Sequence, residues 1–166
     1  MSEAAPGAAA VAPEPPLSPP AMATGLRIGL GLLMAYAGAM KLIEPPATFA
    51  EEIGNYRLLP ALAPAAAATL PAVEVVAGLA LILLRGGWRQ GAALLNLSLL
   101  LVFTAAVASA RARGIDLRCG CFGGESGPVT NLTVLRDLGL SAWAGLVWWQ
   151  SRGQTQRPGA PATTGR

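Results

Sequence analysis

Residues 90–110 read QGAALLNLSLLLVFTAAVASA, and no charged side chain interrupts them between Arg89 and Arg111. A helix needs about 20 mostly apolar residues to cross the hydrocarbon core of a bilayer. This stretch therefore predicts a transmembrane helix and indicates an integral membrane protein. The composition agrees, because 53% of the residues are hydrophobic, only 13% are charged and the mean hydropathy is +0.49.

Three further apolar segments complete the set of predicted spans: 24–43, 61–84 and 129–149. Arg27 and Lys41 lie near the ends of the first span, where long side chains can extend to the membrane surface. Short spans of this composition satisfy their backbone hydrogen bonds as helices, since a barrel would need many more strands of alternating polarity. We expect an all-α fold, a polytopic bundle of four transmembrane helices in one domain over residues 23–150.

The two ends of the chain differ from this apolar body. Residues 1–22 are rich in alanine and proline and contain no basic residue, so they lack the charged start of a signal peptide and predict a disordered tail. Met22 stands directly before the first predicted span and is an alternative start of the chain. Residues 151–166 predict a short polar tail.

Composition also excludes several classes of function. The chain has no histidine, which excludes His-ligated haem, His-containing zinc sites and a histidine general base. The formal net charge of +3 comes from arginines scattered between apolar segments, so we predict no nucleic-acid partner. The remaining chemistry must use thiols, carboxylates or a bound cofactor, and the expected partner of the body is the lipid bilayer.

Both cysteines of the chain stand in the run Cys119-Gly120-Cys121-Phe122-Gly123, between the third and fourth predicted spans. A disulfide between them requires a turn, for which Gly120 supplies the backbone freedom. So small a ring would be strained and readily exchanged, and the arginines that precede it favour the thiolate form. We therefore predict that Cys119 and Cys121 are a catalytic redox pair. Buried structural cysteines and a copper(I) site are the alternatives, and no other metal site is predicted.

Four ionisable residues near or inside the predicted spans form a second group of candidates: Lys41, Glu74, Arg136 and Asp137. Such residues face the interior of a bundle or water, and they need partners. Because neighbours on a helix point about 100° apart, we expect Arg136 to pair with Glu74, and Asp137 to pair with Lys41 or Asn96. These pairs either lock the helices together or form a polar pocket beneath the cysteines that relays protons or holds the head of a quinone.

Orientation does not follow from charge, because the basic residues near the span ends are divided equally between the two sides. An even number of spans puts both tails on one side. We place the tails in the cytoplasm and the cysteine loop outside it, because disulfide chemistry is favoured in the extracytoplasmic space.

Several runs of residues carry a family likeness: Ala37-Gly38-Ala39-Met40-Lys41-Leu42, Tyr56-Arg57-Leu58-Leu59-Pro60, Leu70-Pro71-Ala72-Val73-Glu74, Arg113-Gly114, Cys119-Gly120-Cys121-Phe122-Gly123 and Arg136-Asp137. In these runs the chain resembles the MauE family of methylamine utilisation proteins, related to DoxX-like membrane proteins, over about Leu26 to Trp149. The resemblance implies a redox-associated protein with four spans in the bacterial inner membrane, similar in architecture to vitamin K epoxide reductase and DsbB. Unlike those two, this chain has no second cysteine pair.

The resemblance also implies a function. MauE proteins are linked to the maturation of methylamine dehydrogenase and act beside a thioredoxin-like protein. By that likeness, Cys119 and Cys121 would exchange electrons with an extracytoplasmic thioredoxin-like partner and support disulfide formation in a periplasmic client. Two alternatives stay open: a membrane scaffold or chaperone without enzymatic activity, and a copper(I)-binding or transport protein. Small residues in the first and third spans permit close helix contacts within or between chains, so a homo-oligomer is compatible with the sequence.

Overall fold

The computed structural model describes residues 20–58, 60–115 and 129–155. Every regular element in these ranges is helical, and the elements follow one another along the chain as α1 (Pro20–Ile43), α2 (Pro46–Asn55), a 3-10 turn (Pro60–Leu62), α3 (Ala63–Leu83), α4 (Gly86–Ala112) and α5 (Asn131–Thr155). The all-α prediction is confirmed for this part of the chain. The predicted tails lie mostly outside the described residues.

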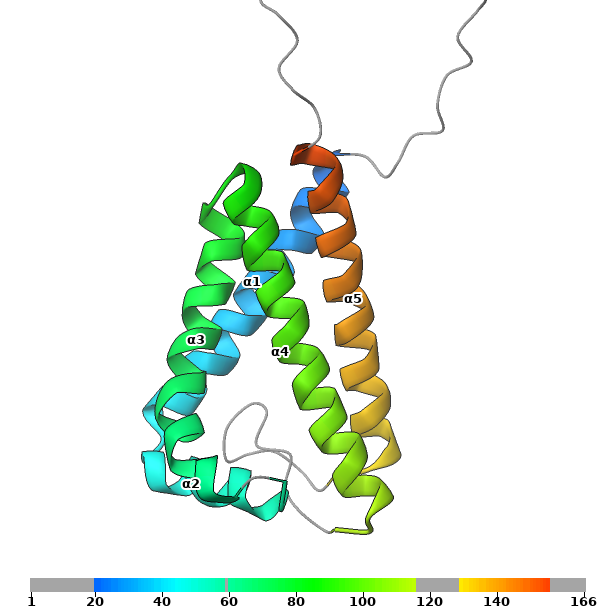
Figure 1. Cartoon of the computed structure of the whole chain (residues 1–166). Helices are drawn as coiled ribbons and strands as arrows, with labels where there is room; N and C mark the ends of the chain where they lie inside the picture. Colours follow the sequence, from blue (N-terminus) through cyan, green and yellow to red (C-terminus); the bar gives the residue numbers. More distant parts are fainter. Residues whose placement is uncertain (1–19, 59, 116–128, 156–166) are drawn as a thin grey trace, which may run out of the picture.

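Three of the described helical segments are long and apolar enough to cross a membrane, namely Ala21–Ile43, Pro60–Leu83 and Gly86–Ala112. They correspond to the first three predicted spans, with ends that differ by a few residues. α5 has the length to cross, with 25 residues, but it is less apolar than the other three. The protein is thus a multi-pass membrane protein with three clear spans and a fourth long helix beside them (Figure 1).

α1 and α3 pack against each other with their backbones in close approach. A Cβ atom added at Gly38 would lie 2.6 Å from the Pro71 carbonyl oxygen, and one at Gly78 would lie 2.5 Å from the Gly31 carbonyl oxygen. Small residues at such positions let membrane helices gain van der Waals contact that larger side chains would block. The glycines of α1 and α3 therefore fix which residues of the two helices face each other.

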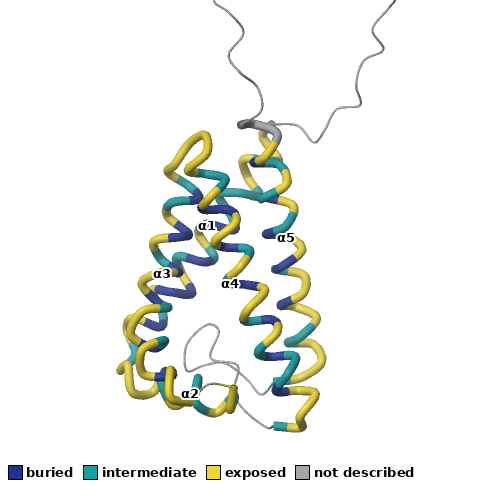
Figure 2. The backbone as a smooth tube through the Cα atoms, viewed as in Figure 1, coloured by how far each residue is buried: buried dark blue, intermediate teal, exposed yellow. Residues whose placement is uncertain are grey.

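α4 and α5 form the second major helix pair, and α4 also packs on α3. The hydrophobic core that the four long helices share lies nearer the end of the bundle at which α1 begins and α5 ends. Its members are buried apolar side chains from all four long helices: Leu30, Met34, Leu81, Ala92, Ala93, Leu100, Ala144 and Val147. Exposed residues recur along all four long helices, as Figure 2 shows. Many of them are large and apolar, and this is the pattern expected for helices that face lipid.

The short helix α2 was not predicted from the sequence. It begins at Pro46, a residue suited to the first turn of a helix, and its Phe49 is buried. α2 lies across the end of the bundle at which α1 ends and α3 begins (Figure 1). The start of α1 and the end of α5 lie together at the opposite end (Figure 1). We call these the α2 end and the terminal end.

Candidate functional site

Lys41 of α1 and Glu74 of α3 form a buried ion pair. Lys41 Nζ lies 2.6 Å from Glu74 Oε1 and 2.7 Å from Oε2, and the side chains are 3% and 1% exposed. The ammonium group also lies over two aromatic rings, 5.6 Å from the centroid of Phe49 on α2 and 5.2 Å from that of Phe103 on α4. Its charge is thus balanced by one carboxylate and two ring faces from three other helices.

This pairing corrects the prediction that Arg136 would bind Glu74. Gly38 brings the backbone of α1 so close to Glu74 that Lys41, one turn further on, reaches the carboxylate with both oxygens accepting a hydrogen bond. Both residues of the pair were predicted from the sequence to need partners. The register of α1 against α3, which brings them together, could not be predicted. That register depends on glycine contacts between segments that are far apart in the chain.

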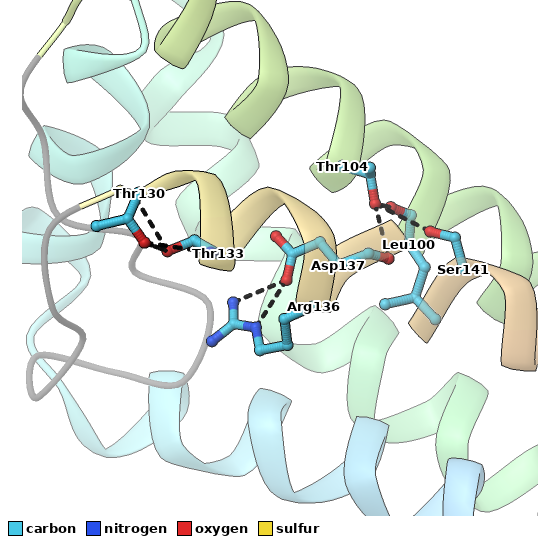
Figure 3. Close-up of polar contacts among 7 residues, drawn as sticks. All are labelled: Leu100, Thr104, Thr130, Thr133, Arg136, Asp137 and Ser141. Carbon is cyan, nitrogen blue, oxygen red and sulfur yellow. Dashed lines mark hydrogen bonds and ion pairs between the residues drawn. The ribbon is translucent and has the colours of Figure 1, made fainter. Parts of the chain in front are cut away.

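Arg136 instead binds its neighbour Asp137, although neighbouring positions on a helix point about 100° apart. Nε and Nη2 of Arg136 donate to Asp137 Oδ1 at 2.9 and 2.8 Å (Figure 3). The side chain of Asp137 is 6% exposed, whereas that of Arg136 is 41% exposed. The flexible arginine side chain spans the angle between neighbouring helix positions and folds back onto the carboxylate, so the predicted Arg136–Glu74 pairing is wrong.

The second oxygen of Asp137 points away from Arg136 (Figure 3). This atom, Oδ2, is buried and accepts no hydrogen bond from any described residue. Asp137 lines a small internal cavity together with Lys41 and Glu74, and the cavity has a volume of about 30 Å3. A cavity of this size, lined by charged groups, has room for a water molecule. The four predicted polar residues are therefore brought together in part: Lys41, Glu74 and Asp137 share a cavity, and Arg136 joins them through Asp137.

Asn96 was the alternative partner predicted for Asp137, and this prediction is also wrong. Its Nδ2 donates to the carbonyl oxygens of Ala77 at 2.9 Å and Ala92 at 2.8 Å. Ala77 belongs to α3, so Asn96 bonds the fully buried faces of α3 and α4 to each other. Its role in the described part of the chain is to join two spans.

A hydroxyl cluster between α4 and α5 was not predicted from the sequence. Thr104 Oγ1 lies 2.9 Å from Ser141 Oγ, 3.2 Å from the Asp137 carbonyl oxygen and 2.7 Å from the Leu100 carbonyl oxygen (Figure 3). All of these polar atoms are buried. The available signal was a single threonine and a single serine on otherwise apolar helix faces, and in a membrane such hydroxyl groups commonly bond across helices.

A larger apolar pocket of about 280 Å3 lies between α2, α3 and α4. Lys41, Phe49 and Phe103 stand at one side of it, and Leu70 and Val107 are among the apolar residues that line the rest. The pocket thus adjoins the Lys41–Glu74 ion pair. It depends on α2, so its existence could not be predicted without that helix. The sequence signal for α2 was Pro45-Pro46 followed by Phe49 and Ile53, one turn apart.

Cys119 and Cys121 lie outside the described residues, so their predicted pairing remains a prediction. The described residues on either side are held in place at the α2 end. Arg113, just after α4, donates to the Tyr56 carbonyl oxygen at 2.6 Å, and Arg111 donates to Asn131 Oδ1 at 3.0 Å. These bonds connect the end of α4 to α2 and to the first residue of α5.

The start of α5 is also capped. Thr130 N donates to Thr133 Oγ1 at 3.1 Å, and Thr133 N donates to Thr130 Oγ1 at 3.3 Å (Figure 3). This reciprocal arrangement resembles a capping box and satisfies a backbone N–H group at the helix start. The chain therefore leaves α4 and enters α5 at fixed points on either side of the cysteines.

The family model of methylamine utilisation protein MauE matches residues 19–150, which is most of the chain. The chain belongs to the MauE family. The match includes α1 to α4, residues 131–150 of α5, both ion pairs and the Cys119-Gly120-Cys121 run. This MauE-family chain is accordingly a membrane protein associated with methylamine utilisation. No curated protein and no solved structure matches the chain.

Proposed function

We propose that this MauE-family protein is a thiol–disulfide redox protein of the bacterial inner membrane. Cys119 and Cys121 exchange electrons with an extracytoplasmic thioredoxin-like partner, and so support disulfide formation or maturation of a periplasmic client such as methylamine dehydrogenase. The observation that carries this proposal is the position of the Cys-Gly-Cys run, between two long helices and within the family match. Two thiols one residue apart beside a membrane surface are suited to exchange more than to structural crosslinking.

In this proposal α5 is the fourth span. Its charges at Arg136 and Asp137 compensate each other, and Asp137 faces the interior of the bundle, which lowers the cost of placing them in a membrane. The start of α1 and the end of α5 share the terminal end, as an even number of crossings requires (Figure 1). The α2 end, where the chain leaves α4 and enters α5, then faces the extracytoplasmic space, where thiols are not kept reduced.

The exchange follows the usual two steps of thiol–disulfide chemistry. A thiolate of the partner attacks one sulfur of the Cys119–Cys121 disulfide, which breaks the S–S bond and forms a mixed disulfide. The second thiolate of the partner then attacks that mixed disulfide. The partner leaves as a disulfide, and Cys119 and Cys121 retain the two electrons and take up two protons as thiols. The reverse sequence reduces the partner by the same steps.

The polar residues of the body support this chemistry from the α2 end. Arg136 lies in the second turn of the helix that follows the cysteines, and its guanidinium is half exposed. A positive charge near a thiol favours the reactive thiolate. Asp137 holds Arg136 from the buried side, and the Lys41–Glu74 pair closes the cavity behind Asp137.

The apolar pocket favours a quinone as a second electron partner. Its volume of about 280 Å3 suits one ring system, with Phe49 and Phe103 available for stacking and the Lys41 ammonium at the same side. A bound quinone would accept the two electrons and two protons of the Cys119 and Cys121 thiols. The substitution Leu70→Trp, which fills the pocket, should abolish reoxidation by a soluble quinone and leave exchange with a small disulfide unchanged. Leu79→Trp, on the exposed face of the same helix, is the matched control.

The deciding experiment is to trap mixed disulfides in intact cells. With only one cysteine left, Cys119→Ser or Cys121→Ser should form a mixed disulfide with a thioredoxin-like protein that this chain can no longer resolve. Acid quenching stops attack by the partner's second thiol and preserves the complex, and the double variant should capture nothing. Labelling by a membrane-impermeant thiol reagent reports on which side the cysteines lie. If Cys119→Ser retains full function in client maturation, the scaffold alternative is correct. If the two thiols instead bind copper(I) and resist labelling until the metal is removed, the copper alternative is correct.

A further inference from the structure

The small cavity beside Asp137 contains a charged acceptor that the described side chains do not satisfy. Asp137 is 4% exposed, and its Oδ1 accepts two hydrogen bonds from Arg136, whereas its Oδ2 accepts none from any described residue (Figure 3). Burial of an acceptor without a donor costs free energy, and the cost is larger for a charged group. The Oδ2 atom therefore requires a small donor that fits beside it.

The wall of this cavity combines polar groups from four helices. They are Lys41 of α1, Glu74 of α3, Thr104 of α4 and Asp137 of α5, and the rest of the wall is apolar. The volume of about 30 Å3 suits water, which can donate to Asp137 and bond a second polar group of the wall. A metal cation suits the cavity less well, because the Lys41 ammonium would repel it and both carboxylates already have cationic partners.

Lys41 stands between this cavity and the apolar pocket. Lys41 and Phe103 line both spaces, whereas Glu74 lines only the small cavity and Phe49 only the apolar pocket. The two oxygens of Glu74 lie 2.6 and 2.7 Å from Lys41 Nζ, and an ammonium group has three N–H donors. One donor therefore remains for a water in the cavity or for a ligand in the pocket. Lys41 can connect the chemistry of the two spaces.

We propose that water in the cavity joins Asp137 to the Lys41–Glu74 pair, and that this chain of groups, the proton relay, carries protons to a quinone in the apolar pocket. The last step rests on the proposed function. Oxidation of Cys119 and Cys121 to the disulfide releases two electrons and two protons, and reduction of the quinone to the quinol consumes them. Asp137 takes up each proton and the water passes it on. Lys41 gives its ammonium proton to a quinone oxygen and is reprotonated from the water.

The charged groups around Asp137 leave it as the carboxylate that begins the relay. Among the described residues, those that face it are Arg136 on its own helix, and Lys41 and Glu74 across the cavity. α4 brings no charged group to the cavity, and Glu52 of α2 lines the apolar pocket instead. Ionisable groups inside a membrane bundle commonly form such relays. Glu52 is the competing source of protons, which an experiment must distinguish from Asp137.

The water is tested first, in the full-length protein without a quinone. An X-ray pulse converts bound water to hydroxyl radicals, which oxidise a neighbouring methionine. Met34 lines the cavity and is only 3% exposed, so its rapid oxidation would report water inside the bundle. Ala37→Val fills part of the cavity and should lower this oxidation severalfold. Ala39→Val, on the exposed face of the same helix, is the matched control and should not. Protection of Met34 in the native protein, or equal oxidation in Ala37→Val, would overturn the proposal.

The relay is tested by a single turnover in which the reduced protein reduces a soluble quinone. Asp137→Asn keeps an acceptor for Arg136 but cannot carry a proton, so the rate should fall about 100-fold, the low end of the effect of a positioned acid. The ratio of native to variant rates should rise with pH, because the variant takes its protons from solvent and thiol ionisation affects both proteins. Asp137→Glu should restore most of the rate. Glu51→Gln, on the exposed face of α2, is the control.

The outcomes separate the relay from the redox proposal. If Asp137→Asn reduces the quinone as fast as the native protein, or if the ratio of rates does not change with pH, the relay is wrong and the redox proposal stands. The same pH-dependent loss in Glu52→Gln would assign the proton source to Glu52 and also overturn the relay. If the native protein exchanges with a small disulfide but does not reduce the quinone, the quinone part of the proposed function is wrong, and the relay with it. Should Asp137→Asn not fold, Ala37→Val must show the same slower reduction, because it displaces the water and keeps every polar residue.

Discussion

The two main helix interfaces of this protein hold their polar groups in different ways. At the α1–α3 interface, glycines bring the backbones together and a buried ion pair, Lys41–Glu74, joins the two helices. At the α4–α5 interface, the buried bonds between the helices come from hydroxyl groups, Arg111 binds Asn131 at the exposed α2 end, and the ion pair, Arg136–Asp137, lies within α5 itself. The first interface cannot separate without leaving a charge unpaired in the membrane. The second can adjust at the cost of a few hydrogen bonds, and no buried charge loses its partner.

This difference assigns a different role to each half of the bundle. α1 and α3 form the fixed part, because a buried ion pair across an interface is costly to break. α5, which follows the cysteines, carries its own charge compensation and would keep it in any small shift against α4. We infer that the Arg136–Asp137 pair lies on the helix that tolerates adjustment. Four substitutions test this comparison, from the largest expected effect to the smallest.

Glu74→Gln should have the largest effect, because it leaves the Lys41 ammonium buried without a carboxylate. We expect the free energy of unfolding in detergent to fall by about 3–5 kcal/mol, the cost of removing one partner of a buried pair. Thermal unfolding followed by circular dichroism measures the loss. The double variant Lys41→Met with Glu74→Gln removes both charges and should recover most of the stability. If it does not, the pair does more than lock α1 to α3.

Gly38→Ala should destabilise the α1–α3 interface through overpacking. The added methyl group would lie 2.6 Å from the Pro71 carbonyl oxygen, and a backbone atom cannot move aside as a side chain can. We expect a loss of about 1–3 kcal/mol in the same unfolding measurement. The control is Gly139→Ala on α5, where nothing lies within 4 Å of the new methyl group. Similar losses in the two variants would mean that close backbone contact is not what distinguishes the α1–α3 interface.

Arg136→Gln should have a smaller effect on stability and a clearer one on the cysteines. Since the arginine side chain is 41% exposed, we expect a loss of only about 1 kcal/mol. The rate of thiol alkylation at Cys119 and Cys121 should fall, because a positive charge that favours the thiolate is removed. Arg136→Lys retains the charge and should keep most of the rate. An unchanged alkylation rate in Arg136→Gln would show that the Arg136–Asp137 pair does not affect thiol reactivity and has only a structural role.

Thr104→Val should have the smallest effect. It removes the hydroxyl contacts of Thr104 with Ser141 and with the Asp137 carbonyl oxygen, and hydrogen bonds between membrane helices average about 0.6 kcal/mol. A double-mutant cycle with Ser141→Ala isolates the pairwise part of this energy. Ser98→Ala is the control, because Ser98 is exposed and bonds only within α4. A coupling energy as large as the effect of Glu74→Gln would contradict the proposed contrast between the interfaces.

The positions of the long helices follow from local sequence. Three spans were predicted to within a few residues because the apolar character of a stretch such as 90–110 is a property of neighbouring residues only. α5 was predicted as a helix of similar position, although its arginines and Asp137 make it less apolar than the other three. The short helix α2 was missed, because its ten residues are too few to show a span and its stability comes from packing Phe49 against the bundle.

The sequence by itself determined which charged residues must be buried and that they need partners, since an unpaired charge in a bilayer is too costly. Only the tertiary structure decided the partners. Lys41 meets Glu74 because glycines set the register of α1 on α3, and Arg136 binds Asp137, its neighbour on α5. Distances between helices depend on contacts among residues far apart in the chain, and a one-dimensional pattern of polarity carries no record of them.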